Sequence, residues 1–587
     1  MKVADCAALG NRVSDMSANV EKKVIGVLAD NPSSGYEPLL AALAELYPVE
    51  FHRTSLSACR GFDALLLLDG DSTKALVAAA EGSPCLVAGE SLGIELSAGS
   101  GEVCFGASNV LDENLRNRTM VTGGRYVAAF LPAVEPGDEI VASVAGRPIW
   151  LARFHGKGTI QITGTSLPLM REKELLFQYF NEDRFLELLP LMNFLSQLVK
   201  QTNWRSSSLR ACLVVDDPSL YLPSYGHLDF RRLADHAEQH NFFVSVATIP
   251  LDAWWVHGRV AEMFRSHYPR LSLLIHGNDH TARDMLLEKD SDVCLSVAAQ
   301  ALRRMERLQR AHQLEVLKIM EAPHGAIADS MFSHLLNLGY EGALGTTRLL
   351  VLHNPKLTWP ASFGLHRSQI VGGGLPVIPR IKMTPNWRNA VLIAAFLRQP
   401  IVIVLHHGDV ADGYEPLIEI AGMINQLDGV TWASPLGIAR SNYTEVRRGD
   451  SLTINLYSRR IQLAIPPGIK SLCVHRPWPQ NGTSEEVILR NSAGEIFRGS
   501  GPEMLDPIPV ESAGEVEVCC PPANPVDYRT VPAPQLRFWP VTRKFLMEAR
   551  DRSAPWRYLV KKFFRGPEPN GLERENRNSC PKQSRKR

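Results

Sequence analysis

The sequence predicts an α/β protein of several domains, built around a central β/α barrel. The chain of 587 residues is too long for one ordinary hydrophobic core, and its length suggests roughly three or four domains. Apolar runs of strand length alternate with helical patterns over most of the chain, which is typical of parallel sheets. After about residue 445 short alternating strands lie between Gly- and Pro-containing turns, a pattern typical of a β-sandwich.

The composition excludes several classes of protein. A hydrophobic fraction of 45% and a charged fraction of 21% are those of a soluble globular protein. The net charge is +1 and there is no long basic stripe, so no nucleic-acid partner is predicted. The ten cysteines show no CxxC pair, which favours reduced thiols. The first residues lack the apolar core of a secretory signal, and no apolar run is long enough to span a bilayer, so a cytoplasmic location is predicted.

Residues 1–21 are polar and predicted to be flexible, and residues 22–204 are predicted to form an N-terminal α/β domain. Strands are expected at Val24–Ala29, Phe62–Leu68 and Cys85–Ala88, with a helix at Leu39–Leu46. This alternation resembles flavodoxin-like and glutamine-amidotransferase-like folds in pattern only. No GxGxxG follows the first strand, so no dinucleotide site is predicted.

The alternation restarts in residues 205–445, where it is longer and cleaner. Around seven βα units over about 230 residues predict a barrel of the (β/α) type. Helices are expected at Leu228–His240, Cys294–His312 and Tyr414–Leu427. The strand-like runs are expected to end at Asp217, Ile249, His276, Pro323, Thr346, Met383 and His407.

The C-terminal part divides into a β-sandwich, predicted for residues 446–545, and a basic tail, 546–587, predicted to be largely disordered. Within it the segment Trp556–Arg565 is both basic and aromatic. Such a segment suits peripheral contact with a membrane surface. The simpler interpretation, which we favour, is a terminal helix that packs on the body of the protein before a solvated tail.

Four polar groups lie at the ends of predicted barrel strands, where side chains converge on one mouth. Two neighbouring carboxylates repel each other, so a proton or a metal ion is expected between them. Each group also has a simpler interpretation: an Asp-Asp pair can be a solvated turn, and HxxxH occurs by chance in a chain with 17 histidines. Their conjunction at strand ends favours a functional site. The groups are Asp216-Asp217, His276-Gly277-Asn278-Asp279-His280, Glu321-Ala322-Pro323-His324-Gly325 and His406-His407-Gly408-Asp409.

The pair His276 and His280 has i, i+4 spacing, which is expected to place both imidazoles on one side of a helical turn. With one carboxylate they make a two-His, one-carboxylate set that leaves coordination positions open. A second Asp can then act as general base, and a His across the mouth can protonate a leaving group. These groups suit metal-assisted hydrolysis of an amide or ester.

The same residues resemble the motifs of the polysaccharide deacetylase family, the NodB-homology domain of carbohydrate esterase family 4. The resemblance covers residues 209 to 440. The matching motifs are Val214-Val215-Asp216-Asp217 for the first, His276-Gly277-Asn278-Asp279-His280 for His-(Ser/Thr)-x-x-His, Glu321-Ala322-Pro323-His324-Gly325 for Arg-x-Pro-x-Gly, and Leu405-His406-His407 for Leu-x-His.

The resemblance implies a distorted (β/α)7 barrel and a divalent metal, usually zinc, held by Asp217, His276 and His280. It implies Asp216 as the base and His407 as the acid, although a shift of one residue would choose His406. The implied activity is removal of an acyl group, such as acetyl, from an N-acylated sugar, a polysaccharide or a glycan precursor.

One departure from the family pattern concerns the charge beside the base. Family members usually carry Arg where Glu321 stands, and that Arg helps to hold the base carboxylate. Glu321 is instead expected to raise a carboxylate pKa or to add an acidic group to the metal environment, so it joins the candidate catalytic residues. The departure leaves two alternatives open: a glycan-binding protein that has lost turnover, and a small-molecule amide hydrolase on the same barrel.

Overall fold

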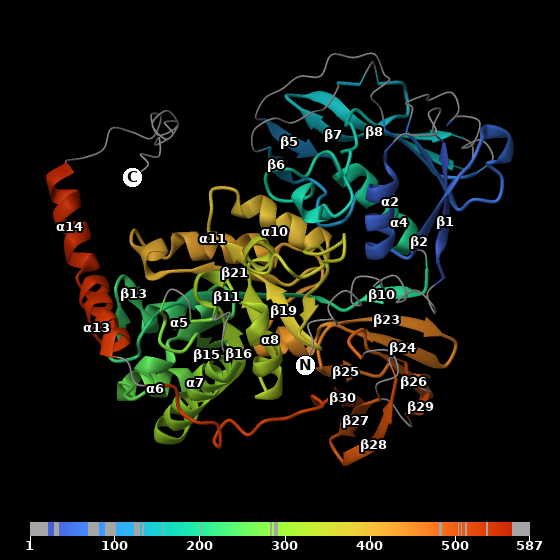
Figure 1. Cartoon of the computed structure of the whole chain (residues 1–587). Coiled ribbons are helices and arrows are strands. Elements are labelled where there is room, and N and C mark those ends of the chain that lie inside the picture. Colours follow the sequence, from blue (N-terminus) through green and yellow to red (C-terminus); the bar gives the residue numbers. More distant parts are fainter. Residues whose placement is uncertain are drawn as a thin grey trace.

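The structure, a computed structural model, arranges the chain as a central α/β domain with smaller units around it (Figure 1). The N-terminal sheet lies on one side, two small β-sheets lie below it, and a C-terminal helical pair lies at the opposite end. The residues that the structure describes are 21–28, 35–68, 75, 82–88, 101–122, 130–131, 134–155, 158–200, 202–281, 284–286, 291–479, 484–502, 504–505, 507–510, 514–535 and 538–565.

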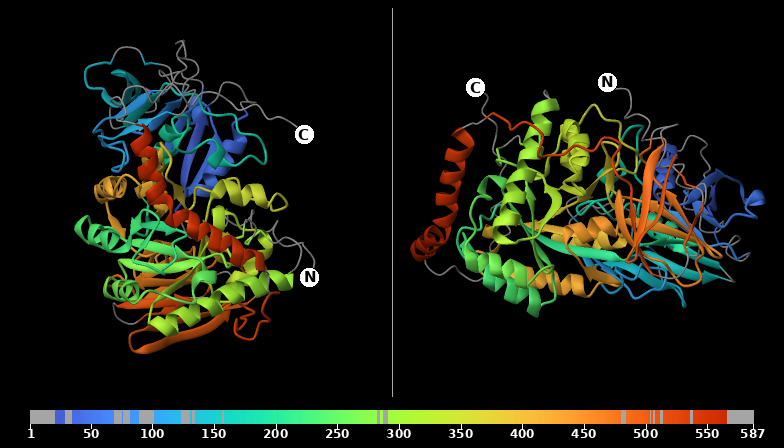
Figure 2. Two further views of the ribbon diagram at one scale, coloured as in Figure 1. Left: turned by 90° about the vertical axis from the view of Figure 1, so that its left-hand side faces the viewer. Right: turned by 90° about the horizontal axis from the view of Figure 1, so that it is seen from below.

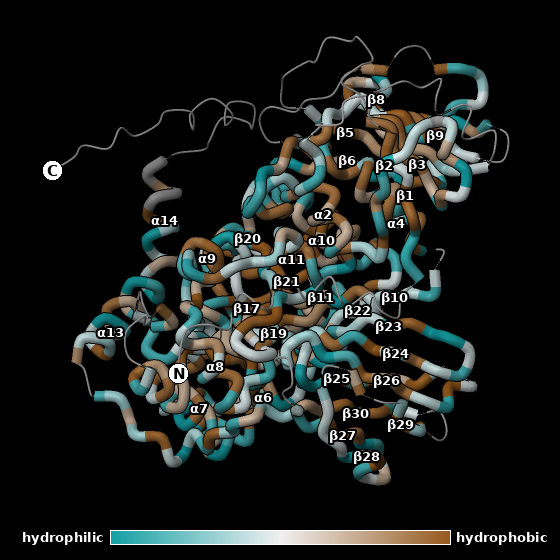
Figure 3. The backbone as a smooth tube through the Cα atoms, turned by 45° about the vertical axis from the view of Figure 1, so that its right-hand side comes forward, coloured by the Kyte–Doolittle hydropathy of each residue, from teal (hydrophilic) through white to brown (hydrophobic). Residues whose placement is uncertain are grey.

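The N-terminal unit is a nine-stranded sheet in the order β2-β1-β3-β4-β9-β8-β7-β5-β6. The half from β2 to β9 is parallel and the rest is antiparallel. The three predicted strands and the predicted helix are confirmed, and the apolar strands give this sheet its hydrophobic interior (Figure 3). The elements are β1 Lys23–Leu28, α2 Glu37–Leu46, β2 Val49–Arg53, β3 Ala64–Leu67, β4 Cys85–Ala88, β5 Glu102–Phe105, β6 Thr119–Val121, β7 Glu139–Val144, β8 Arg147–His155, β9 Gly158–Thr163 and α4 Leu189–Lys200.

The central sheet has the order β18-β19-β17-β16-β15-β14-β11-β21-β20, with β22 paired to β11. Every pair is parallel except β18 with β19, and each predicted run contains a strand that stops at or just before the predicted end. The strands are β11 Leu209–Asp216, β14 Val244–Thr248, β15 Leu271–His276, β16 Val316–Glu321, β17 Gly342–Gly345, β18 Gln369–Val371, β19 Leu375–Pro379, β20 Ile381–Lys382, β21 Ile401–Leu405 and β22 Val430–Trp432.

Helices alternate with these strands. The three predicted helices are confirmed within a few residues as α5 Phe230–Gln239, α7 Ser291–His312 and α11 Glu415–Asn425. Each follows a strand and packs its apolar residues toward the sheet, as βα units require. The remaining helices of this domain are α6 Gly258–Ser266, α8 Asp329–Asn337, α9 Thr347–His353, α10 Trp387–Phe396 and α12 Pro435–Arg440.

Arg380 connects the two sides of the central sheet near its ends. This residue alone separates β19, which pairs with β17, from β20, which pairs with β21. The Arg380 amide donates to the carbonyl of Gly345 at 3.1 Å, and the next residue turns to the other partner. The described strands therefore curl toward each other without a continuous hydrogen-bonded ring. The predicted (β/α)7 barrel is correct at the coarser level of a mixed α/β domain with a curved sheet.

The C-terminal strands form a five-stranded sheet, β10-β23-β24-β26-β29, and a four-stranded sheet, β25-β30-β27-β28, around a shared apolar core. The domain boundaries predicted at residues 204 and 445 fall inside β10 and β23, which pair with each other, so the structure differs there. The strands are β10 Trp204–Ser206, β23 Tyr443–Arg448, β24 Ser451–Leu456, β25 Arg460–Ala464, β26 Ser471–His475, β27 Glu485–Asn491, β28 Gly494–Gly501, β29 Ile508–Pro509 and β30 Glu515–Cys519.

The chain continues into helices α13 (Phe538–Arg552) and α14 (Ala554–Arg565). The tail predicted from residue 546 is therefore helical as far as residue 565, because polar side chains of α13 bind the central domain. Residues 1–20 of the predicted flexible N-terminus and residues 566–587 of the predicted tail lie outside the described residues. Among the described helices, none is long and apolar enough to cross a membrane.

Candidate metal centre

Strand β11 ends in the two aspartates that the sequence singled out. Asp216 is the last strand residue, and Asp217 follows with φ of 80°, in the left-handed region that non-glycine residues seldom adopt. In a regular strand two neighbouring side chains point to opposite faces. Here the turn at Asp217 brings both carboxylates to His276, one in each of two overlapping groups of possible metal ligands.

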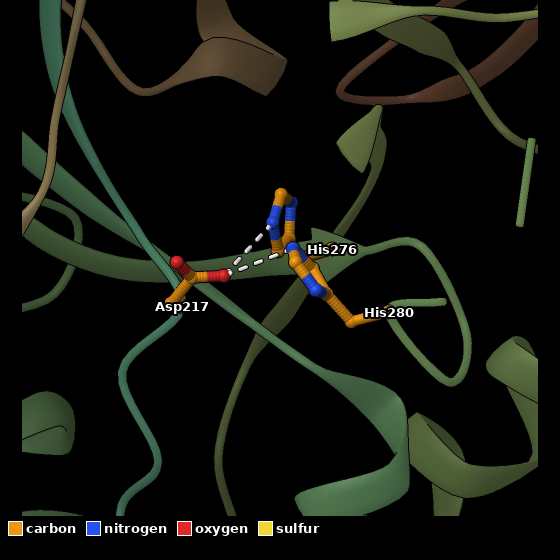
Figure 4. Close-up of side chains that lie close together, drawn as sticks. All are labelled: Asp217, His276 and His280. Carbon is orange, nitrogen blue, oxygen red and sulfur yellow. Dashed lines mark ion pairs between the residues drawn. The ribbon is translucent and has the colours of Figure 1, made fainter. Parts of the chain in front are cut away.

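Three predicted ligands converge at the end of the sheet (Figure 4). Oδ1 of Asp217 lies 3.4 Å from Nε2 of His276 and 3.1 Å from Nε2 of His280. Two ligand atoms at roughly 2.1 Å from a tetrahedral ion are about 3.4 Å apart, so this spacing fits one shared cation. Both imidazoles are buried, and Asp217 Oδ1 is a buried atom with no well-directed hydrogen-bond donor. The donor set therefore fits a divalent ion.

Neighbouring groups set the protonation of two of the candidate ligands, His276 and Asp217. Nδ1 of His276 lies 3.2 Å from the carbonyl oxygen of Glu321. A carbonyl only accepts, so Nδ1 carries the proton and Nε2 keeps its lone pair for a metal. Burial opposes ionisation of Asp217, but hydrogen bonds and charge interactions from His276 and His280, when each carries a proton on Nε2, hold the pKa of its carboxyl well below the usual range. A bound metal ion would take the place of those protons. The carboxylate is thus ionised, as a ligand must be.

The loop that carries His280 is not the helical turn that its spacing predicted. Gly277 has φ of 59° and His280 has φ of 52°, and no helix forms between them. Instead Oδ2 of Asp284 accepts the backbone N–H groups of Asn278, Asp279 and His280 at 2.9, 2.7 and 2.7 Å. A Cβ at Gly277 would lie 2.6 Å from Cγ of Pro323, so close packing explains Gly at the position where the family has a hydroxyl residue.

Arg380 supplies a positive charge that the sequence did not reveal. Its Nη1 lies 3.3 Å from Oδ2 of Asp216, and the same guanidinium forms an ion pair with Glu321. All three side chains are buried, with exposed fractions of 7%, 3% and 0% for Arg380, Asp216 and Glu321. Burial lowers the pKa of the Arg380 guanidinium, and Asp216 opposes that shift. Glu321 is therefore paired with Arg380, and its carboxylate also lies in a group of possible ligand atoms with Asp216 and His276.

Space for this guanidinium comes from Gly325, which has φ of 76°. A Cβ there would lie 2.6 Å from Nη2 of Arg380 and 2.5 Å from Oγ1 of Thr346. The other oxygen of the base candidate, Oδ1 of Asp216, is buried and receives no hydrogen bond. Asp216 also shares a group of possible ligand atoms with His276, and a free oxygen in that position suits a group that takes a proton.

The two adjacent histidines after β21 differ in environment. His406 is exposed, and its backbone N–H donates to Asp409 at 2.7 Å. His407 is half-buried against Tyr225, with ring centroids 5.5 Å apart, and its Nε2 lies 3.7 Å from Oδ1 of Asp551. Burial and then the charge of Asp551 raise the pKa of Tyr225, and the charge of Asp217 adds to the shift. Of the two, His407 faces the mouth.

Helix α13 lies against the central domain (Figure 2). Polar side chains of this helix bind the loops at the mouth. Lys544 Nζ is 2.7 Å from Asp252 Oδ2, and Tyr225 donates its hydroxyl to Asp551 at 2.7 Å. Arg543 donates to the carbonyl oxygen of His280 and lies 3.5 Å from its Nδ1. Burial opposes ionisation of Asp551, but His407, Arg550 and Tyr225 hold its pKa below the usual range. The helix thus contacts loops after four different strands of the sheet.

Comparisons with known proteins give structural likenesses only. No protein-family model matches the chain, and no curated protein sequence matches it. Agd3, a carbohydrate deacetylase, is similar at 9% identity and a TM-score of 0.45 over 85% of this chain and 99% of that one. A family 4 carbohydrate esterase from Streptomyces lividans matches at 13% identity and a TM-score of 0.24, over 39% of this chain and 94% of that one.

A pseudoenzyme of the same esterase family from Bacillus anthracis matches at 12% identity and a TM-score of 0.25, over 40% of this chain and 66% of that one. These proteins are of the class that the motifs indicate. With TM-scores below 0.5, the function of this chain has to be inferred from its own side chains.

The ion pairs of Arg380 predict a large and specific loss of stability. Arg380→Ala leaves two buried carboxylates without their cation, and the expected loss is roughly 3–5 kcal/mol in the free energy of unfolding, measured by denaturant titration. Arg388→Ala is the matched control, because the Arg388–Glu419 pair is about half exposed, and its expected cost is below about 1 kcal/mol. Equal losses in the two variants would contradict the role given to Arg380.

The loop that carries His280 gives a second prediction. Asp284→Ala removes the acceptor of three backbone N–H groups, so metal affinity is expected to fall roughly 10- to 100-fold, measured by competition with a chelating dye. Asp284→Asn keeps one acceptor oxygen and should lie between the parent and Asp284→Ala. Unchanged affinity in Asp284→Ala would show that this loop does not need its hydrogen bonds to hold His280.

Proposed function

We propose that this protein is a metal-dependent hydrolase that removes an acyl group, such as acetyl, from an N-acylated sugar unit of a polysaccharide or glycan precursor. The observation that carries the proposal is the convergence of Asp217, His276 and His280 beside the free buried oxygen of Asp216. A metal site alone would suit many proteins. A metal site beside a carboxylate with one oxygen that receives no hydrogen bond suits activation of water.

Each residue has a separate task in this proposal. Asp217, His276 and His280 hold a divalent ion, for which zinc is the first choice because imidazole and carboxylate ligands suit it. The ion supplies Lewis-acid polarisation of the acyl carbonyl. Asp216 takes a proton from the attacking water, whose oxygen forms the new bond to the acyl carbon. The C–N bond breaks, and His407 gives a proton to the departing amine.

Arg380 orients the base in this scheme. Its contact with Oδ2 of Asp216 leaves Oδ1 as the oxygen without a hydrogen bond, which is the one available to take a proton. The family arrangement implied by the sequence uses an Arg at the position of Glu321. Here the Arg comes from the junction of β19 and β20, and Glu321 balances part of its charge. The absence of Arg at position 321 was the reason for expecting a glycan-binding protein that has lost turnover. Because Arg380 supplies a guanidinium to Asp216, that reason is weaker.

Paired variants of the two aspartates separate metal binding from proton transfer. Asp217→Ala is expected to lose the copurifying divalent ion, measured by elemental analysis, and with it the activity. Asp216→Asn is expected to keep the ion but to lose acetate release from acetylated chito-oligosaccharides by roughly 10²- to 10⁴-fold. A parent protein that purifies without a divalent ion and takes up none would contradict the proposed site.

The adjacent histidines provide an internal control for the acid. His407→Gln is expected to lower kcat by about 10²-fold, because the departing amine then lacks its proton donor. His406→Gln is expected to leave kcat unchanged, because His406 is exposed, whereas His407 is half-buried against Tyr225 and Asp551. If kcat fell only in His406→Gln, the assignment would have to move by one residue.

A further inference from the structure

The C-terminal helices carry an unusual concentration of exposed apolar side chains. Among the described residues, eight of the nineteen exposed large apolar side chains lie in α13 and α14. Phe538 is 90% exposed and Phe563 is 84% exposed. A surface helix normally turns its apolar side chains to the core. The exposed set is Phe538, Trp539, Val541, Phe545, Leu546, Trp556, Leu559 and Phe563.

The inner side of α13 explains why its apolar side chains face outward and not toward the core. Its buried side chains include Lys544 and Asp551, which bind Asp252, Tyr225 and His407 at the mouth. A polar mouth requires a polar helix face, so the apolar residues of α13 are left facing outward. Exposed apolar surface of this extent marks an interaction site, because covering it is worth roughly 25 cal/mol per Å².

The charge of the same segment narrows the choice of partner. Residues 538–565 contain eight Lys and Arg but only two acids, Glu548 and Asp551. Glu548 accepts a hydrogen bond from Ser219, and Asp551 accepts one from Tyr225, so both acids are turned to the central domain. Three of the basic residues, Arg543, Lys544 and Arg552, also bind the central domain. The outward side combines Trp and Phe with the remaining basic residues, of which Arg550 and Arg557 are exposed.

We propose that α13 and α14 form a docking surface for an anionic lipid membrane. Trp and Phe partition to the boundary between headgroups and acyl chains, and Lys and Arg are attracted to anionic headgroups. A second copy of this chain fits less well, since a symmetric contact would bring two strongly basic surfaces together. Docking in this orientation places the mouth beneath α13 close to the bilayer.

The test is sedimentation of the full-length protein with vesicles, which does not depend on any enzymatic activity. We expect binding to vesicles of equal parts phosphatidylglycerol and phosphatidylcholine, and much weaker binding to phosphatidylcholine alone. Phe545→Ser combined with Phe563→Ser should reduce the partition coefficient by roughly tenfold or more. Arg557→Glu should reduce it several-fold at low salt, since each basic residue near the surface contributes.

Phe154→Ser is the matched control, because Phe154 is also exposed but lies on β8 of the N-terminal sheet, and its binding should equal that of the parent. The proposal is overturned if the parent does not sediment with anionic vesicles at low salt, or if Phe154→Ser loses as much binding as the helix variants. It is also overturned if the helix variants abolish concentration-dependent dimerisation and the parent ignores vesicles, since the occupant is then a second copy.

Discussion

The candidate site depends on one buried cation, Arg380, held between Asp216 and Glu321. Neither carboxylate could stay charged away from water without it, since an unpaired buried charge is far costlier than a paired one. The cation neutralises only part of the acidic charge. Asp216, Asp217 and Glu321 with Arg380 leave two negative charges when the imidazoles are neutral, which is the charge that a divalent ion balances.

Much of this arrangement could be predicted from the chain. Buried parallel strands appear in the sequence as continuous apolar runs, so the sequence shows where each strand ends. The polar groups at those ends include all three candidate ligands. The ligand loop was not predictable in shape, because i, i+4 spacing suits a helical turn and only Asp284 and Gly277 explain the real conformation. The way in which the two sides of the sheet are connected was not predictable either. It depends on a change of strand partner at one residue, Arg380.

Arg380 was missed because its partner Asp216 is 164 positions away in the sequence. A lone Arg near the end of an apolar run is most simply a surface residue, and no local pattern distinguishes it from one. Glu321 therefore looked like a change that removes function. Glu321 and Arg380 form an ion pair. The carboxylate stands where the family pattern has Arg, and the guanidinium comes from another part of the chain. A reversed charge in one motif is thus informative only when its partner is known.

The cover provided by α13 links this site to the rest of the molecule. Its contacts with Asp252, Tyr225 and His407 are polar, and polar contacts exchange with water at a small net cost compared with apolar packing. In the proposed reaction a substrate would reach Asp216 through the space that α13 covers, so substrate entry and the contacts of α13 would compete. The outer face of α13 is apolar and basic. A partner that binds this outer face therefore also changes how readily the inner face gives up its contacts with the mouth.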